Sequence, residues 1–255
     1  MLSQYSRIIL DVSQTLYDNN QTPLKGSFEF LKKYKEKIIV VSNIGSLTGV
    51  ELRKKLNTIF KIDITNVITS LDLVINHLNK KKYDNIFHYG SSQILEKLKS
   101  ETNLSFIEDH SCNKIETLLF TSLCKDLSWI KLTQNTLNLM ARENINIILG
   151  NPDRSCPIKP HNFTVSLIHD ALLSSCIELG YSPKSIEIGK PNIKIEELGI
   201  SLNEKTVVIG DNPKTDGLLA MKNKFDYIQV GNNVVGNELL NNILVKNTRS
   251  LIEIV

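Results

Sequence analysis

The feature that most constrains this chain is a recurring unit: a short apolar run, a polar residue where the run ends, and then a helical stretch. Continuous β-branched runs of this length are typical of strands buried on both faces of a parallel sheet. Strands that alternate with helices at this pace predict an α/β fold. The clearest runs are residues 7–10, 38–41 and 206–209, which lead into Asp11, Ser42 and Asp211.

The middle of the chain, residues 71–181, has an alternation of strands and helices of its own. We therefore predict two nested domains: a core formed by residues 1–70 and 182–255, and an inserted α/β domain formed by residues 71–181. The short segment 185–188 precedes Lys190, and we expect it to be a strand of the core sheet.

Composition narrows the classes of function. The 255 residues are 41% hydrophobic, which is enough for a packed core, and the net charge of +3 gives no basic stripe for nucleic acid. No apolar stretch approaches the 18 residues that a membrane span needs, and no export signal is visible, so we expect a cytoplasmic protein with no membrane partner. The cysteines lack metal-ligand spacing and are expected to be free thiols: Cys112, Cys124, Cys156 and Cys176.

Ligands of open parallel sheets bind outside the carboxyl ends of the strands. Carboxylates, a hydroxyl and an amine fall there: Asp11, Ser42, Lys190, Asp211 and Asp216. Clustered carboxylates repel unless a cation binds between them, and hard oxygen ligands suit Mg²⁺. An amine and a hydroxyl suit phosphate oxygens. A carboxylate beside both can attack phosphorus and form an aspartyl-phosphate.

Four segments and their order resemble the motifs of the haloacid dehalogenase-like hydrolases: residues 11–16, 41–43, 189–191 and 208–216. The long insert between the second and third segments is similar to the α/β cap of the NagD-type subclass, and Asn151-Pro152-Asp153 resembles a characteristic cap segment. The resemblance implies a Rossmann-like, doubly wound parallel core with a smaller α/β cap.

The resemblance also implies roles for individual residues. Asp11 would be the nucleophile and a Mg²⁺ ligand, and Asp211 a second Mg²⁺ ligand supported by Asp216. Ser42 and Asn43 would contact the phosphate, and Lys190 would neutralise it and orient Asp11.

In the cap, Asp153 would face the substrate and help select the leaving group; its alternative interpretation is a turn residue. The other polar cap candidates are Asn146, Asn151, Arg154 and Lys159.

Two residues depart from the family pattern. Ser13 stands where the family's phosphatases have a second Asp, the general acid and base, although its backbone carbonyl still offers a metal ligand. Gln14 replaces a glycine in the same turn, where its side chain either crowds the pocket or offers an amide to the substrate. A hydroxyl is no useful acid or base near neutral pH, and that assistance is worth about 10²–10⁴-fold in rate.

Several readings stay open. The chain is a slow or restricted phosphatase for a small phosphorylated metabolite, or an inactive relative that binds a phosphorylated ligand or a protein partner. A third reading is a hydrolase of another carbon–heteroatom bond with Asp11 as nucleophile. A scaffold that keeps only the fold is also compatible, since fold does not fix function. Family analogy allows a homodimer.

Overall fold

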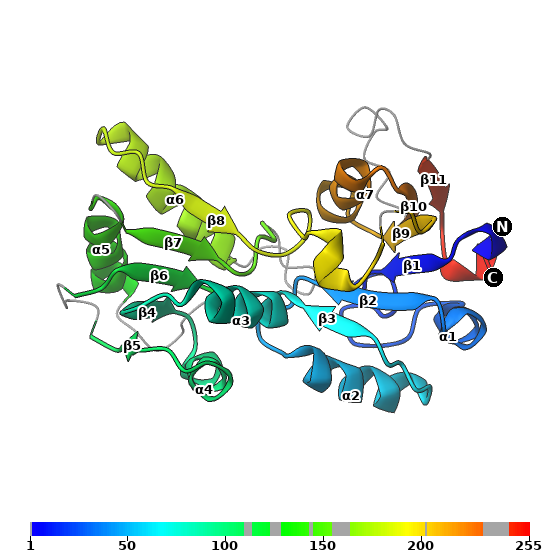
Figure 1. Cartoon of the computed structure of the whole chain (residues 1–255). Helices are drawn as coiled ribbons and strands as arrows, with labels where there is room; N and C mark the ends of the chain where they lie inside the picture. Colours follow the sequence, from blue (N-terminus) through cyan, green and yellow to red (C-terminus); the bar gives the residue numbers. More distant parts are fainter. Residues whose placement is uncertain are drawn as a thin grey trace. The chain divides into compact units, whose positions relative to one another are not determined.

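The computed structural model describes residues 2–109, 114–122, 129–142, 145–154, 164–201, 203–231 and 245–255. These residues form two compact units (Figure 1). The first unit comprises Met1–Ser42, Leu47–Thr69 and Gly189–Val255, and the second comprises Asn43–Ser46 and Ser70–Ile188. The α/β fold class predicted from the sequence is confirmed.

The first unit is built on a six-stranded sheet with the order β11-β10-β9-β1-β2-β3, in which every pairing is parallel. Figure 1 shows α7 on one side of this sheet and α2 on the other. The strands are β1 (Arg7–Leu10), β2 (Ile38–Ser42), β3 (Val67–Thr69), β9 (Thr206–Gly210), β10 (Asp226–Val230) and β11 (Val245–Thr248). The helices are α1 (Ser27–Tyr34), α2 (Gly49–Phe60) and α7 (Leu218–Asn223), with 3₁₀ turns at Leu2–Gln4, Ile195–Leu198 and Leu251–Glu253.

The winding of this sheet reverses at its centre. The chain moves from β1 through β2 to β3 at one edge, and from β9 through β10 to β11 at the other. The carboxyl ends of the adjacent strands β1 and β9 therefore meet at a topological switch point, where sheets of this kind bind ligands. Every residue of β2 and β9 is buried, as their continuous apolar sequences predicted.

The second unit holds a five-stranded parallel sheet with the order β5-β4-β6-β7-β8. Alternate residues of β4, β6 and β7 pack with α5 and α6 into one apolar core that includes Phe87, Phe120 and Leu149. The strands are β4 (Ile86–Tyr89), β5 (Phe106–Ile107), β6 (Thr117–Phe120), β7 (Asn146–Leu149) and β8 (Ser185–Glu187). The helices are α3 (Ser70–Lys81), α4 (Ser92–Glu101), α5 (Trp129–Met140) and α6 (Val165–Glu178).

One strand was placed wrongly from the sequence. The run 185–188 was expected in the core sheet, but β8 pairs with β7 in the second unit, with Ile148 opposite Ile186. The side chain of Ile186 is 44% exposed, as fits an edge strand. Lys190 therefore follows a strand of the other sheet and enters the first unit on the segment after Gly189.

The cysteines and the absence of a membrane span were predicted from composition. Cys176 is a buried free thiol, whereas Cys112, Cys124 and Cys156 lie outside the described residues, as does the cap candidate Lys159. Among the residues that the structure describes, no helix combines the length and the apolar character needed to cross a bilayer.

Candidate active site

The site begins where β1 and β9 end side by side. The backbone N–H of Asp11 donates to the carbonyl of Ile209 at 2.9 Å, which carries the pairing of the two strands one residue beyond β1. Asp11 is 8% exposed, and Asp211 follows β9 directly. Ser42, the last residue of the neighbouring strand β2, is also buried. Asp11, Ser42 and Asp211 thus lie at one edge of the first unit's sheet.

Lys190 joins two of the carboxylates. Its Nζ donates to Asp11 Oδ1 at 2.5 Å and to Asp216 Oδ1 at 2.7 Å, and its side chain is 2% exposed. Burial disfavours the ammonium, but Asp11 and Asp216 outweigh burial and raise the pKa of Lys190 above its usual range. Lys190 therefore stays charged at any physiological pH and fixes the Asp11 carboxylate.

Asp216 is positioned by a short π-helical turn, Pro213–Gly217, that follows β9. The Asn212 side chain accepts from the N–H of Lys214 at 3.0 Å, and the N–H of Asn212 donates to Asp216 Oδ2 at 3.3 Å. Gly210 leaves the space for this carboxylate, because a Cβ at position 210 would overlap the Asp216 carboxylate carbon and oxygen. The sequence Gly-Asp-Asn-Pro thus folds back so that Asp216 faces Lys190.

The carboxylates of Asp11, Asp211 and Asp216 are close enough to share a cation. One carboxylate oxygen from each residue lies within 4.8 Å of one oxygen from each of the other two. Burial, followed by repulsion from Asp11 and Asp216, raises the pKa of Asp211 to about 8. Burial likewise raises the pKa of Asp216 to about 7, against the opposing effect of Lys190. Three carboxylates beside one ammonium leave an excess of negative charge, and this donor set fits Mg²⁺ held by Asp11 and Asp211.

The turn after β1 contains the two departures from the family pattern. Ser13 is half-buried there, and the N–H of Leu16 closes the turn on the carbonyl of Val12 at 2.8 Å. Gln14 has φ +58°, the left-handed region in which glycine is favoured. Its Nε2 donates to Asn19 Oδ1 at 2.6 Å on the surface. The Gln14 amide is therefore engaged with Asn19 in this structure.

Asn43 and Asp153 are brought together within the second unit. Asn43 Nδ2 donates to Asp153 Oδ1 at 2.7 Å, and the Asn43 side chain is buried. Arg154, a second cap candidate, is bound by Asp170 and Glu187. Asn151 accepts the backbone N–H of Asp153, whereas Asn146 lies exposed at the start of β7.

Two residues of the site were not assigned from the sequence. Thr15 is fully buried, and its Oγ1 donates to Asp11 Oδ2 at 3.5 Å; its place four residues after Asp11 was the available signal. Tyr227 donates from its hydroxyl to the carbonyl of Gly210 at 3.2 Å. Burial and the nearby carboxylates raise the pKa of Tyr227. Nothing in the sequence of β10 marks this tyrosine, because it lies inside an ordinary strand pattern.

A model of one protein family matches the N-terminal part of the chain. Residues 8–102 match the model of a family described as haloacid dehalogenase-like hydrolase. The resemblance to these hydrolases is confirmed. The matched residues include Asp11 and Ser42, while Lys190, Asp211 and Asp216 lie beyond them and reach Asp11 through the fold. No match was found among curated proteins.

Solved structures share the fold of this chain over almost its whole length. A 4-nitrophenylphosphatase from Thermotoga maritima is 24% identical, with a TM-score of 0.76, and the match covers 99% of this chain and 97% of that one. A p-nitrophenyl phosphatase from Archaeoglobus fulgidus is 21% identical, with a TM-score of 0.77 and coverage of 99% and 100%. NagD from E. coli K-12 is 20% identical, with a TM-score of 0.74 and coverage of 99% of both chains.

Proposed function

We propose that the chain is a Mg²⁺-dependent phosphatase of a small phosphorylated metabolite, with Asp11 as the nucleophile and turnover weakened by Ser13. The observation that carries the proposal is the buried Lys190 ammonium, bonded to Asp11 and Asp216 beside Asp211. The phosphatases among the solved structures of the same fold support the reaction class.

The residues of the site divide the reaction between them. Lys190 holds Oδ1 of Asp11, so Oδ2, which accepts only the 3.5 Å contact from Thr15 among the hydrogen bonds described above, would attack phosphorus as the phosphorus–oxygen bond to the leaving group breaks. Lys190 and the Ser42 hydroxyl are suited to the phosphoryl oxygens. Mg²⁺, when bound, would neutralise negative charge; Asp11, Asp211 and the Ser13 carbonyl would hold it. Water then hydrolyses the aspartyl-phosphate. Because Ser13 is no acid, the leaving group takes its proton from water.

This proposal predicts Mg²⁺-dependent hydrolysis of an aryl phosphate, whose leaving group departs without a proton. p-Nitrophenyl phosphate is a suitable probe, with release of nitrophenolate followed by absorbance. Asp11→Asn should abolish turnover, because an amide cannot attack phosphorus, while leaving the protein folded. Turnover that survives in Asp11→Asn, or that proceeds equally in excess chelator, would contradict the proposed mechanism.

A second candidate is a protein that binds a phosphorylated ligand without turning it over. Ser13 in place of a proton donor favours it, because Lys190 and the carboxylates could bind phosphate and metal without an acid. This candidate predicts that Mg²⁺ and inorganic phosphate together raise the melting temperature while no aryl phosphate is hydrolysed. Hydrolysis lost in Asp11→Asn favours the phosphatase.

The raised carboxylate pKa values predict an opposite pH dependence for the metal-free and metal-loaded protein. Folding raises the pKa of Asp211 from 3.8 to about 8. The contribution of this group to the stability of the fold is therefore complete below pH 3.8, and it is lost as the pH rises through 8. In chelator, unfolding free energy should therefore fall by roughly 1 kcal/mol per pH unit between pH 6 and 8. Mg²⁺ requires ionised ligands, so its stabilising effect should be larger at pH 8.5 than at pH 6.

Urea unfolding at each pH, with and without Mg²⁺, measures both trends. Asp211→Asn serves as the reference, because its amide does not titrate and its curve should be flatter in chelator. A Mg²⁺ effect that is equal at both pH values would exclude Asp211 as a ligand that must lose a proton.

A further inference from the structure

The segment that directly follows Ser42 is held by the second unit. Within Asn43–Ser46, the carbonyl of Asn43 accepts from Ser70 Oγ at 3.0 Å, and the carbonyl of Ser46 accepts from Lys97 Nζ at 3.0 Å. A Cβ at Gly45 would lie 2.6 Å from the carbonyl oxygen of Thr121, so the backbone is packed closely there. The chain thus passes from a strand of the first unit straight into contacts of the second.

The segment is also held by a side-chain hydrogen bond, from Asn43 Nδ2 to Asp153 Oδ1. The distance is 2.7 Å, the Asn43 side chain is 4% exposed, and the acceptor is a carboxylate. Hydrogen bonds to charged groups are among the stronger ones in proteins. The contact therefore fixes where Asn43 lies, and through the peptide bond it restrains Ser42.

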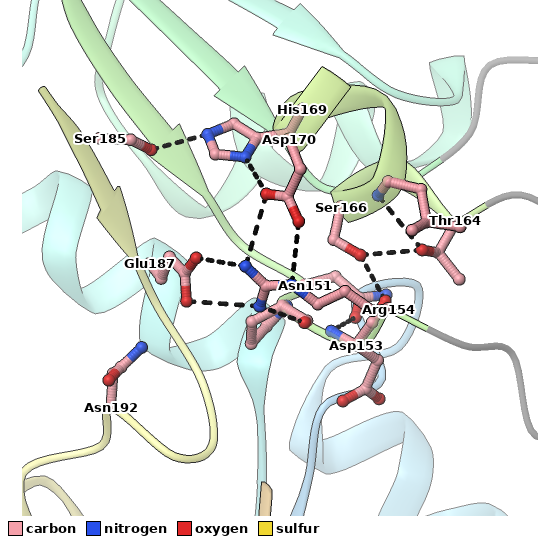
Figure 2. A network of polar contacts seen from close by, with 12 residues as sticks. Asn151, Asp153, Arg154, Thr164, Ser166, His169, Asp170, Ser185, Glu187 and Asn192 are labelled. Atoms are coloured by element: carbon pink, nitrogen blue, oxygen red, sulfur yellow. Dashed lines mark hydrogen bonds and ion pairs between the residues drawn. The ribbon is translucent and has the colours of Figure 1, made fainter. Parts of the chain in front are cut away.

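Asp153 is itself fixed from several sides (Figure 2). Its N–H donates to Asn151 Oδ1 at 3.3 Å, and its carbonyl accepts from Ser166 Oγ on α6. The next residue, Arg154, donates to the carbonyl of Pro152 at 2.8 Å, which closes the segment on itself. The carboxylate that receives Asn43 is thus carried by a tightly held loop.

Arg154 ties this loop to α6 and β8. Its guanidinium contacts Asp170 at 3.0 Å and Glu187 at 2.6 Å, as Figure 2 shows. His169 bridges Asp170 and Ser185 at 3.0 and 2.8 Å, in the hydrogen-bond order of a hydrolase triad. Both oxygens of Asp170 also accept from Arg154, so the arrangement serves to hold the guanidinium.

We propose that Asp153 is a positioning residue for the phosphate-binding segment: it holds Asn43, and thereby Ser42, in place. The inference rests on the proposed phosphate site and differs from the sequence-based expectation that Asp153 selects the leaving group. The two roles predict different effects of Asp153 on the binding of inorganic phosphate. A positioning residue affects inorganic phosphate, which has no leaving group, whereas a residue that recognises the leaving group does not.

The experiment measures the dissociation constant of inorganic phosphate in saturating Mg²⁺ by calorimetry. Asp153→Ala should raise it about tenfold, because a hydrogen bond to a charged group is lost. Asn43→Ala should do the same, and the double variant should be no weaker than either single variant. Asp153→Asn keeps an acceptor oxygen and should recover most of the affinity. Asp84→Ala, the same exchange at an exposed carboxylate of the second unit, should bind as the wild type does.

The outcomes separate this inference from the proposed function. If the wild type binds phosphate and Asp153→Ala binds within twofold of it, the positioning role is wrong. If the wild type binds no phosphate with Mg²⁺, the proposed function fails. The thermal unfolding of the two single variants and the double variant then tests the contact by itself: additive losses of melting temperature overturn it, and non-additive losses support it.

Discussion

Lys190→Met should lower the free energy of unfolding by about 3–5 kcal/mol at pH 7.5 in the absence of metal, the usual effect of breaking a buried ion pair. The methionine fills much of the same volume, so the loss is electrostatic. Asp11 and Asp216 would keep their burial without the ammonium that lies 2.5 and 2.7 Å away. Urea unfolding followed by circular dichroism measures this loss relative to the wild type.

Lys99→Met is the matched control. Lys99 also lies between two carboxylates, Glu96 at 3.4 Å and Glu108 at 2.6 Å, but these groups are exposed to solvent. Exposed pairs contribute little, so this variant should unfold like the wild type. The loss in Lys190→Met should also shrink at pH 5, where the carboxylates of the variant can take up protons. Equal stability of the two variants at pH 7.5 would show that Lys190 carries no buried charge interaction.

The Lys190 cluster also shows what the sequence could and could not predict. Asp11 and Asp211 were predictable together, because each directly follows an apolar run and parallel strands end at one edge of a sheet. Asp216 was also predicted near the end of the strand that precedes Asp211, but its contact with Lys190 depends on a π-helical turn that no local pattern predicts. The residue types of the site were therefore readable, but the contacts among them required the fold.

The placement of Lys190 itself was reached from a wrong premise. The run 185–188 looks like any core strand, and the sequence carries no sign that β7 is its partner. Pairing between strands depends on the whole sheet, which local periodicity does not encode.

The contact between Asn43 and Asp153 could not be predicted from the sequence. These residues are 110 positions apart, and each belongs to a short polar segment that reads as a turn. The resemblance marked both as candidates for ligand contact, but it did not indicate that they bind each other. Polar residues in loops are readable as candidates, whereas their partners depend on how two loops fold against each other.

The sharpest expected effect on activity is that of Ser13→Asp. If Asp11, Lys190 and the metal ligands form a working site, restoring a proton donor two residues after the nucleophile should raise turnover by about 10²–10⁴-fold. Ser13 is half-buried, and backbone hydrogen bonds close the turn around it, from Leu16 N–H to the Val12 carbonyl and from Gln14 N–H to the Tyr17 carbonyl, so the exchange should leave the fold intact. Steady-state hydrolysis in saturating Mg²⁺, beside the wild type, is the measurement.

The dependence on the leaving group distinguishes acid catalysis from a general improvement of the site. An alkyl phosphate expels a basic alkoxide and should gain nearly the full factor from Ser13→Asp, whereas p-nitrophenyl phosphate needs little protonation and should gain less. Ser13→Asn places a side chain of the same shape as Asp at this position, but its amide does not titrate. This variant should therefore stay near the wild-type rate on both substrates. Equal rates for the Asp and Asn variants would exclude a missing proton donor as the cause of weak turnover. The cause would then lie in the geometry of the pocket or in Gln14, which has a φ of +58° and carries a side chain where the resemblance implies glycine.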